Sequence, residues 1–487
     1  MTTTTQSDVA LPWEGDNELA AQPKWHLSIA WYLDAPERIG EVAVVGERSV
    51  LGRGAETPED GAPRLRFARV RPGWTSPTEP LESSRISRLQ LKLTASPSGI
   101  EVERVGRCAM LHNGRELDRA VLREGDVLTL RNALVLLVVR RPQAHPPLET
   151  YPVNRMGAFG QADPFGFVGE SPAIWELRDQ LAFAAGTSHH VLLLGESGVG
   201  KELAARAVHE LSARSARPLI ARNAATFPEG LVDAELFGTV KNYPNPGVPD
   251  RKGVIGEAHG STLFLDEIGE LPPHLQAHLL RVLDQRGEYQ RLGEARARES
   301  DFRLIAATNR PLESLKPDFI ARFTLLRWLP GLEQRREDIP LLIAHLLRSA
   351  LRENQALLER FFEAGPAEAA VVRVEPGLVE RLLGHEYRSH VRELKRLLWM
   401  AASSSSGRYI ALTDAVRAEL EREPEAKVSQ EPTRLQLDAA LQRAGGSVTR
   451  AARLLGLKNR YVLYRLLRKH ELKIGDDDDE TPSSPSG

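Results

Sequence analysis

A glycine-rich loop at residues 195–201 restricts the possible folds of this chain more than any other feature. Four apolar residues, Val191–Leu194, precede it and predict a strand that is buried on both faces. Gly195, Gly198 and Gly200 allow the backbone to turn back on itself, and Lys201 stands where the next helix is predicted to begin. This G-x-x-x-x-G-K spacing predicts a loop that surrounds phosphate groups with backbone N–H groups and the lysine ammonium.

The alternative interpretation is an ordinary glycine-rich turn with a surface lysine. It does not explain why strand, loop and helix follow one another in the order that a phosphate loop requires. The residues expected to contact phosphates are Gly195, Glu196, Ser197, Gly198, Val199, Gly200, Lys201 and Glu202.

Length and composition exclude several classes of protein. The 487 residues exceed a single hydrophobic core, so about three domains are expected. No apolar run is long enough to cross a bilayer, and the N-terminus lacks a basic region followed by an apolar one, so we expect a cytoplasmic protein without membrane contact. Cys108 is the only cysteine, which rules out an intramolecular disulfide and a thiolate zinc site.

The chain divides into segments of different character. Residues 1–22 are polar and predicted to be disordered, 23–141 contain short β-rich runs, and 142–163 form a Pro- and Gly-rich linker. Residues 164–404 alternate strand and helix patterns, which predicts an α/β domain with a parallel sheet followed by a helical lid. A second linker spans 405–432, three helical patterns span 433–474, and 475–487 form an acidic disordered tail.

The β-rich segment 23–141 predicts a β-sandwich, because its strand-like runs are short and separated by turn residues. Its residues resemble a forkhead-associated (FHA) domain, a reader of phosphothreonine peptides. The resemblance rests on Leu51-Gly52-Arg53, Ser87-Arg88, Asn113-Gly114 and Leu122-x-x-Gly125-Asp126.

This resemblance implies a phosphopeptide site. Arg53 and Ser87, with Arg88 beside them, would bind the phosphate of a phosphothreonine protein, and Asn113 would bind the peptide backbone. Gln90 stands where the family usually has histidine, and Arg107-Cys108-Ala109 replaces the usual Ser/Thr/Asn contact loop. A working reader and a sandwich kept only for docking both remain open.

Two further strands of the α/β segment end in polar residues. The strand before Asp266 and Glu267 ends in paired carboxylates, one of which can hold Mg²⁺ while the other polarises an attacking water. The strand before Asn309 ends in an amide that could sense a terminal phosphate. A solvated strand end is the alternative for the acidic pair, but the phosphate loop in the same domain favours nucleotide chemistry.

Six motifs in this segment resemble the AAA+ ATPase domain of sigma-54-dependent transcriptional activators. They are GESGVGKE, ELFG (235–238), TLFLDEIGELP (262–272), RLIAATNR (303–310), RREDIP (335–340) and VREL (391–394). The resemblance implies ATP and Mg²⁺ as cofactors and a homo-oligomeric ring, usually a hexamer. It also implies that Lys201 contacts phosphates, Asp266 serves Mg²⁺ and Glu267 is the catalytic base.

The same resemblance assigns Asn223 as the residue that switches Glu267, Asn309 as the first sensor and Arg392 as the second. Arg322 would reach the active site of a neighbouring subunit. Two positions depart from the family. The loop that carries GAFTGA in these activators reads Thr239–Gly247 with prolines at 244 and 246, and Lys316 stands at the first of the two trans-acting arginines.

The C-terminal segment 433–474 predicts three helices with a short turn at Gly456-Leu457-Lys458, which suits a helix-turn-helix. It resembles the Fis-type DNA-binding domain that ends such activators. A three-helix bundle with a merely solvated basic face is the alternative. The residues expected to contact DNA are Lys458, Asn459, Arg460, Tyr461, Tyr464 and Arg465.

The three resemblances together imply a multidomain, DNA-binding transcriptional regulator that hydrolyses ATP, is controlled by an FHA-like domain and acts on sigma-54 RNA polymerase. The departures at 239–247 and 316 keep two alternatives open. One is a transcriptional regulator that is independent of GAFTGA and not coupled to sigma-54. The other is a phosphoprotein-binding adaptor whose ATPase is vestigial.

Overall fold

The structure is a computed structural model that describes residues 22–56, 61–228, 230–284, 287–352, 354–362 and 371–422, together with Leu437, Leu463 and Leu467. The contacts within the chain divide it into two compact units, Met1–Arg417 and Ala418–Gly487. Residues 1–21, the acidic tail and the predicted DNA contacts lie outside the described residues; those contacts are Lys458, Asn459, Arg460, Tyr461, Tyr464 and Arg465.

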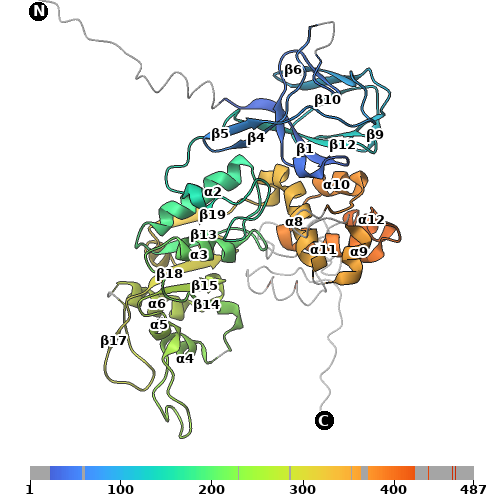
Figure 1. Cartoon of the computed structure of the whole chain (residues 1–487). Coiled ribbons are helices and arrows are strands. Elements are labelled where there is room, and N and C mark those ends of the chain that lie inside the picture. The colour runs from blue at the N-terminus through green and yellow to red at the C-terminus, as the bar shows by residue number, and fades with distance from the viewer. Residues whose placement is uncertain are drawn as a thin grey trace, which may run out of the picture. The chain divides into compact units, whose positions relative to one another are not determined.

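The N-terminal region consists of two antiparallel sheets. Their strand orders are β5-β4-β2-β1-β12-β11-β8-β9 and β10-β7-β6-β3. Figure 1 draws this region in blue, near the N-terminus. The strands are β1 (Lys24–Tyr32), β2 (Val42–Val44), β3 (Ser49–Leu51), β4 (Ala68–Arg71), β5 (Trp74–Pro77), β6 (Leu91–Ser96), β7 (Gly99–Arg104), β8 (Met110–His112), β9 (Arg115–Glu116), β10 (Arg119–Leu122), β11 (Val127–Leu130) and β12 (Leu134–Arg141).

One hydrophobic core lies between these sheets. In β6, Leu91 and Leu93 are buried while Lys92 and Thr94 are exposed, because successive side chains of a strand point to opposite faces. Both leucines belong to the same apolar cluster as residues of β1, β11 and β12 from the other sheet. The alternation of side chains therefore decides which face of β6 is buried.

The central domain is built on a parallel sheet with the order β14-β15-β18-β13-β19. Its strands are β13 (Val191–Leu194), β14 (Ile220–Asn223), β15 (Thr262–Asp266), β18 (Arg303–Thr308) and β19 (Leu325–Trp328), and β16 (Glu288–Tyr289) pairs separately with β17 (Arg298–Glu299). The parallel sheet confirms the expectation from the alternating sequence pattern.

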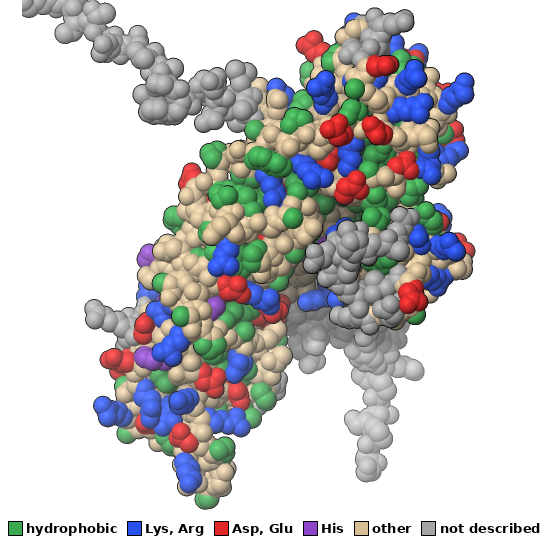
Figure 2. Space-filling view, viewed as in Figure 1, with side chains coloured by type: hydrophobic (Ala, Val, Ile, Leu, Met, Phe, Trp, Pro, Cys, Tyr) green, Lys and Arg blue, Asp and Glu red, His purple; other side chains and the backbone are tan. Residues whose placement is uncertain are grey.

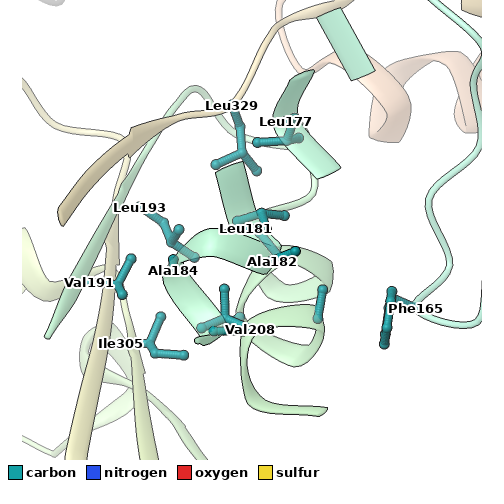
Figure 3. Close-up of a cluster of buried hydrophobic side chains, with 14 of the residues drawn as sticks. Phe165, Leu177, Leu181, Ala182, Ala184, Val191, Leu193, Val208, Ile305 and Leu329 are labelled. Carbon is teal, nitrogen blue, oxygen red and sulfur yellow. The ribbon is translucent and has the colours of Figure 1, made fainter. Parts of the chain in front are cut away.

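Helices cover both faces of the parallel sheet. They are α2 (Pro172–Ala185), α3 (Lys201–Glu210), α4 (Val232–Phe237), α5 (Gly253–Glu257), α6 (Pro273–Asp284) and α7 (Pro317–Ile320). Val191 and Leu193 pack with α2 and α3 on one face (Figure 3), whereas Leu192 and Leu194 pack with α4–α7 on the other. Strand β13 is thus buried on both faces, as its continuous apolar run predicts.

A helical lid follows the sheet. It contains α8 (Ile339–Arg352), α9 (Gln355–Phe361), α10 (Pro376–Leu383) and α11 (His390–Ser404), and α12 (Asp414–Leu420) comes next. In α11 the buried residues Leu394, Leu397, Leu398 and Ala401 recur at the three- and four-residue spacing of one helix face. Within the described ranges, no helix combines the length and the apolar character that a bilayer crossing needs.

The predicted linker 142–163 packs against the central domain. Tyr151 is buried in the cluster of α2 and α3, with its ring edge-on to Phe165 and Trp175. The Asp179 carboxylate accepts hydrogen bonds from the backbone N–H groups of Thr150 and Tyr151, each at 2.8 Å. This segment therefore contributes to the core of the domain that it precedes.

Two buried carboxylates accept hydrogen bonds from the segment that precedes α2. Asp163 accepts the Nε–H of Arg178 at 2.9 Å and two backbone N–H groups. Asp338, which is 0 % exposed, accepts the backbone N–H groups of Glu170 and Ser171 and the Ser171 hydroxyl, at 2.7, 2.9 and 2.6 Å. Burial raises the pKa of Asp338, and the Arg335 guanidinium opposes that rise. The segment between these carboxylates is fixed before α2 begins.

We expect Asp338→Ala to destabilise the central domain strongly. The change leaves buried donors at Glu170 and Ser171 without acceptors, which costs about 3 kcal/mol and lowers the unfolding midpoint by roughly 6–12 °C. Thermal unfolding followed by circular dichroism measures the shift. Glu176→Ala, on the exposed face of α2, is the matched control and should shift the midpoint little. Equal midpoints for the two variants would contradict the assigned role of Asp338.

Candidate functional site at the glycine-rich loop

The glycine-rich loop lies between the end of β13 and the start of α3. Gly198 and Gly200 have φ values of 86° and 109°, which side chains rarely tolerate. A Cβ atom on Gly198 would lie 2.2 Å from the Ser389 carbonyl oxygen, so the lid approaches the loop too closely for any side chain there. The loop conformation and the lid contact both require glycine.

Lys201 is held inside this loop. Its Nζ donates to the carbonyl oxygens of Gly195 at 2.9 Å and Glu196 at 3.2 Å, and the residue is 7 % exposed. Burial lowers the pKa of the Lys201 ammonium, and the nearby carboxylates of Glu267 and Asp266 oppose that change. Glu202, by contrast, is exposed beside Arg206 on the outer face of α3. The ammonium is therefore positioned for an anion in the loop, and Glu202 is not.

The acidic pair at the end of β15 lies beside Lys201 in the same site. Glu267 has a φ of 50°, and its Oε2 atom is buried without a hydrogen-bond partner. Its backbone N–H donates to Asp266 Oδ1 at 2.9 Å. Asn223 is in register with Asp266 on the neighbouring strand, and its Oδ1 accepts the backbone N–H of Ala225 at 2.8 Å. A strained residue with an unsatisfied buried carboxylate oxygen is typical of a functional site.

A cleft of about 1000 Å³ opens at the carboxyl ends of the central strands. Gly195, Glu196, Asn309 and Trp328 are among the residues that line it, together with one side of α2. Crevices at this edge of a parallel sheet are the usual ligand sites of α/β domains. Arg322 follows α7 in an exposed position and is not among the lining residues.

The lid contributes the predicted second sensor. Arg392 Nη1 donates to the Ser197 hydroxyl at 2.8 Å, and the backbone N–H of Val391 donates to the Gly198 carbonyl at 3.3 Å. His390 also contacts this loop, with Nε2 at 3.2 Å from Glu196 Oε2. The sequence prediction missed His390, because only its position two residues before Arg392 pointed toward the site.

Residues 239–251, which include the segment 239–247 that stands in place of the GAFTGA loop, are closed at their base and contact a second loop. Thr239 pairs with Arg251 and with Leu292, and a Cβ atom on Gly293 would lie 2.5 Å from the Tyr243 ring. Residues 241–247 are exposed. Basic side chains gather over this end of the central domain (Figure 2); the exposed ones are Lys241, Arg251, Lys252, Arg281, Arg296 and Arg298.

Ion pairs strengthen the junction of these two loops. Arg291 lies 3.1 Å from Asp250 of the first loop and 2.8 Å from Glu294 of its own loop. Hydrogen bonds from Arg298 and Arg291 lower the pKa of Glu294 to about 2. The two loops therefore form one connected projection.

The predicted phosphopeptide residues fall into two places. Arg53 donates its backbone N–H to the Ser87 carbonyl at 3.1 Å, and the Ser87 hydroxyl accepts the backbone N–H of Arg107 at 3.0 Å. Arg88 is exposed beside them. Asn113 follows the opposite end of β8, where its side chain bonds to Asp126 and to the backbone N–H of Val127, each at 2.8 Å. The structure brings Arg53, Ser87 and Arg107 together, and Asn113 is not part of this cluster.

Gln90 occupies the position where the resemblance expects histidine. It is fully buried, and its Nε2 donates to the Cys108 carbonyl at 2.8 Å while its Oε1 accepts the Cys108 backbone N–H at 3.3 Å. Gln90 therefore joins the loop of Ser87 to the loop of Arg107.

Comparison with known proteins agrees with this geometry. Residues 167–326 match the Sigma-54 interaction domain, and residues 435–470 match the Bacterial regulatory protein, Fis family. The chain is 36 % identical to Transcriptional regulatory protein ZraR of Salmonella typhimurium, over 62 % of this chain and 69 % of that protein. It is 36 % identical to the Nif-specific regulatory protein of Azotobacter vinelandii, over 63 % of this chain and 60 % of that protein.

Among solved structures, NtrX from Brucella abortus in complex with ADP has a TM-score of 0.45 and 28 % identity, covering 64 % of this chain and 70 % of that one. The fold and the phosphate loop define an AAA+ ATPase-like domain. Together with the matched segments, they show that the chain belongs to the family of transcriptional regulators that carry a sigma-54 interaction domain and a Fis-type DNA-binding domain.

We expect Glu294→Gln to loosen the connected projection, because the neutral amide cannot replace two charge-assisted hydrogen bonds. Hydrogen exchange of the amides of Leu292 and Val240, which bond across the junction, should become about tenfold faster. In the unchanged chain, acid should have the same effect, since this stabilisation is present above pH 4.5 and is lost as the pH falls toward about 2. Glu299→Gln, an exposed neighbour, is the control. Unchanged exchange in Glu294→Gln would show that these ion pairs do not hold the loops.

Proposed function

We propose that this protein is an ATP-hydrolysing transcriptional regulator of the sigma-54 activator type. The observation that carries the proposal is the arrangement of Lys201 and Glu267 around the glycine-rich loop. The lysine ammonium is buried and donates to the Gly195 and Glu196 carbonyl oxygens of the loop, and an unsatisfied buried carboxylate oxygen of Glu267 faces the same site. Together they can bind a terminal phosphate and polarise the water that attacks it.

The residues present also fit a magnesium nucleotide. Asp266 ends β15 next to Glu267 and would hold Mg²⁺, whose role is to neutralise charge on the phosphates. Asn223 is in register with Asp266 and would control the orientation of Glu267, while Asn309 would orient the water or sense the terminal phosphate. Arg392, bonded to Ser197, would respond from the lid.

We further propose that the protein works as a homo-oligomeric ring. Arg322 lies just after α7 in an exposed position, where a neighbouring subunit could reach it. Lys316, at the start of α7, supplies a point charge where a second guanidinium is expected, which would slow hydrolysis.

We propose that the N-terminal region is an FHA-like sensor that controls the ATPase. Arg53, Ser87 and Arg107 cluster at one end of β8, where cationic and hydroxyl groups suit a phosphate. Thr129 of β11, which pairs with Leu111 of β8, donates its hydroxyl to Glu380 of the lid helix α10 at 2.9 Å. A phosphothreonine protein bound at the first end would therefore act on the lid through β8 and its neighbour β11.

The Fis-type segment matched at 435–470 would bring the ATPase to DNA. Within it, Lys458, Asn459, Arg460, Tyr461, Tyr464 and Arg465 remain the proposed DNA contacts. A second candidate function is a regulator that is not coupled to sigma-54. It is favoured by the connected projection, in which residues 239–251 are fixed to a second loop and contain Pro244 and Pro246.

We expect Glu267→Gln to bind ATP but to lower kcat for its hydrolysis by about 10²–10⁴-fold, because the general base is lost. Lys201→Ala should weaken ATP binding itself. Phosphate release and binding of a fluorescent ATP analogue separate the two effects. Glu210→Gln, on the exposed end of α3, is the matched control and should hydrolyse ATP like the unchanged chain. If the unchanged chain is no more active than Glu267→Gln, the enzyme proposal fails and an adaptor with a vestigial ATPase is favoured.

We expect the full chain to bind sigma-54 in the presence of a transition-state nucleotide analogue, at least about tenfold more weakly than a GAFTGA-bearing family member, because the central contact residues differ. Size-exclusion chromatography of the two mixtures makes the comparison. The Glu267→Gln variant tests whether binding depends on the nucleotide state. No complex with this chain, under conditions where the relative forms one, would favour the regulator that is not coupled to sigma-54.

A further inference from the structure

His390 lies where the lid, the phosphate loop and the connection between the central domain and the lid meet. It is the first residue of α11, is 2 % exposed, and has a φ of 43°, in the left-handed region that few side chains adopt. A residue with such a backbone conformation persists only where surrounding contacts stabilise it, and residues of this kind cluster at functional sites.

The two ring nitrogens of His390 have different partners. Nδ1 accepts the backbone N–H of Leu332 at 3.2 Å, which places the proton of the neutral ring on Nε2. Nε2 lies 3.2 Å from Glu196 Oε2 in the phosphate loop, although the angle at this contact falls outside hydrogen-bond geometry. Glu333 Oε2 lies 3.6 Å from Nδ1, which carries no proton for it in the neutral ring. The free donor of His390 therefore faces Glu196.

Close packing fixes the ring in this place. A Cβ atom on Gly331 would lie 2.6 Å from His390 Cε1, so the connection to the lid passes directly against the ring. On the other side, the Ser389 carbonyl lies against Gly198 of the phosphate loop. Two residues further along, Arg392 reaches the Ser197 hydroxyl. The segment 389–392 is thus attached to the phosphate loop at three successive residues of that loop.

We propose that His390 is a positioning residue of the nucleotide site. By presenting its unpaired Nε2–H to the Glu196 carboxylate oxygen 3.2 Å away, it keeps the phosphate loop close to the lid and so holds Arg392 over the loop. This inference rests on the proposed ATP binding. Because His390 contacts the connection at Leu332 as well, it makes the shape of the loop depend on the angle of the lid.

The proposal has a kinetic consequence that separates it from a role in folding. His390 does not touch the reacting atoms, so its loss removes order from the loop in the ground state and the transition state alike. Uniform loss of binding raises KM without lowering kcat. Closing this 3.2 Å contact into a charge-assisted hydrogen bond when nucleotide binds would correspond to about a tenfold change in affinity.

Two substitutions separate the side-chain contact from the backbone conformation. His390→Asn keeps a residue that tolerates positive φ but is too short to reach Glu196. His390→Gln tolerates positive φ less well but carries an amide donor that can reach Glu196. If the contact matters, Asn loses function and Gln keeps it; if only the backbone matters, the order is reversed.

The experiment measures kcat and KM for ATP, and the affinity for a fluorescent ADP analogue, with the full chain and these variants. We expect His390→Asn to raise KM and weaken ADP binding about tenfold, with kcat unchanged within about twofold, and His390→Gln to stay within about threefold of the unchanged chain. Combining His390→Asn with Glu196→Ala should add no further loss, because the two residues act as one pair. Thermal unfolding of each variant shows whether it is folded.

Normal KM and ADP affinity in His390→Asn would overturn the proposal, and so would additive losses in the double variant. A lowered kcat with unchanged KM would also overturn it, since that pattern belongs to a residue acting in the transition state. If Asn unfolds the chain, His390→Gln combined with Glu196→Ala replaces it, and normal affinity there would count against the pair. Failure of the unchanged chain to bind either nucleotide is a different result, which would remove the proposed function and this inference together.

Discussion

The site depends on the lid touching the phosphate loop at a residue without a side chain. Gly198 lies against the Ser389 carbonyl, so close that a Cβ atom would overlap it at 2.2 Å. This contact allows Val391 and Arg392 to bond to the loop from the lid. A larger residue at position 198 would force the lid away and would separate the predicted second sensor from the loop. Glycine is therefore required at position 198 for two reasons: the lid packs against the loop there, and the φ angle is positive.

Three glutamates connect the N-terminal region to the ATPase, and each belongs to a different part of it. Glu170 before α2 pairs with Arg71 of β4 at 2.9 Å, Glu337 in the connection to the lid pairs with Arg141 of β12 at 2.6 Å, and Glu380 of α10 accepts the Thr129 hydroxyl at 2.9 Å. Burial raises the pKa of Glu337 and of Glu380, which means that both carboxylates lose favourable hydration on folding.

These contacts make the two parts of the ATPase share one support. Glu170 belongs to the central domain and Glu380 to the lid, and both bond to the same β-rich region. A change in the angle of the lid must therefore break a buried bond or move the N-terminal region. Because breaking one partner of a buried pair leaves the other charge uncompensated, such a change is energetically unfavourable. These contacts therefore restrain movement of the lid relative to the central domain.

Local features could be predicted from the sequence, and contacts between distant segments could not. Apolar runs and glycine spacing predict the phosphate loop and the strand before Asp266, and the structure places both as expected. Asn113 matched a family pattern, but its amide serves Asp126 instead of the Arg53 cluster, because the short strand β8 separates them. His390 and the packing of Tyr151 depend on residues far away in the chain, which leave no periodic signal.

The connected projection lies at the opposite ends of the strands that carry the proposed catalytic residues. Residues 239–251 precede β15, which ends at Asp266 beside Glu267, and the hairpin β16–β17 precedes β18, which ends beside Asn309. Strands of five and six residues span roughly 17–20 Å. The hairpin is joined to the proposed nucleotide site by β18, and residues 239–251 are joined to it by α5 and β15. The Ser300 hydroxyl donates to the Ile255 carbonyl at 2.6 Å and joins the two paths before the strands begin.

Movement at the nucleotide site would therefore reach both loops together. In residues 239–251 the prolines fix φ, and the Arg291 ion pairs hold the base of the loop. A loop restrained in this way transmits a displacement but cannot refold around a partner. Whatever surface it contacts must already be complementary to Tyr243 and the exposed prolines, since the loop has little freedom to adapt.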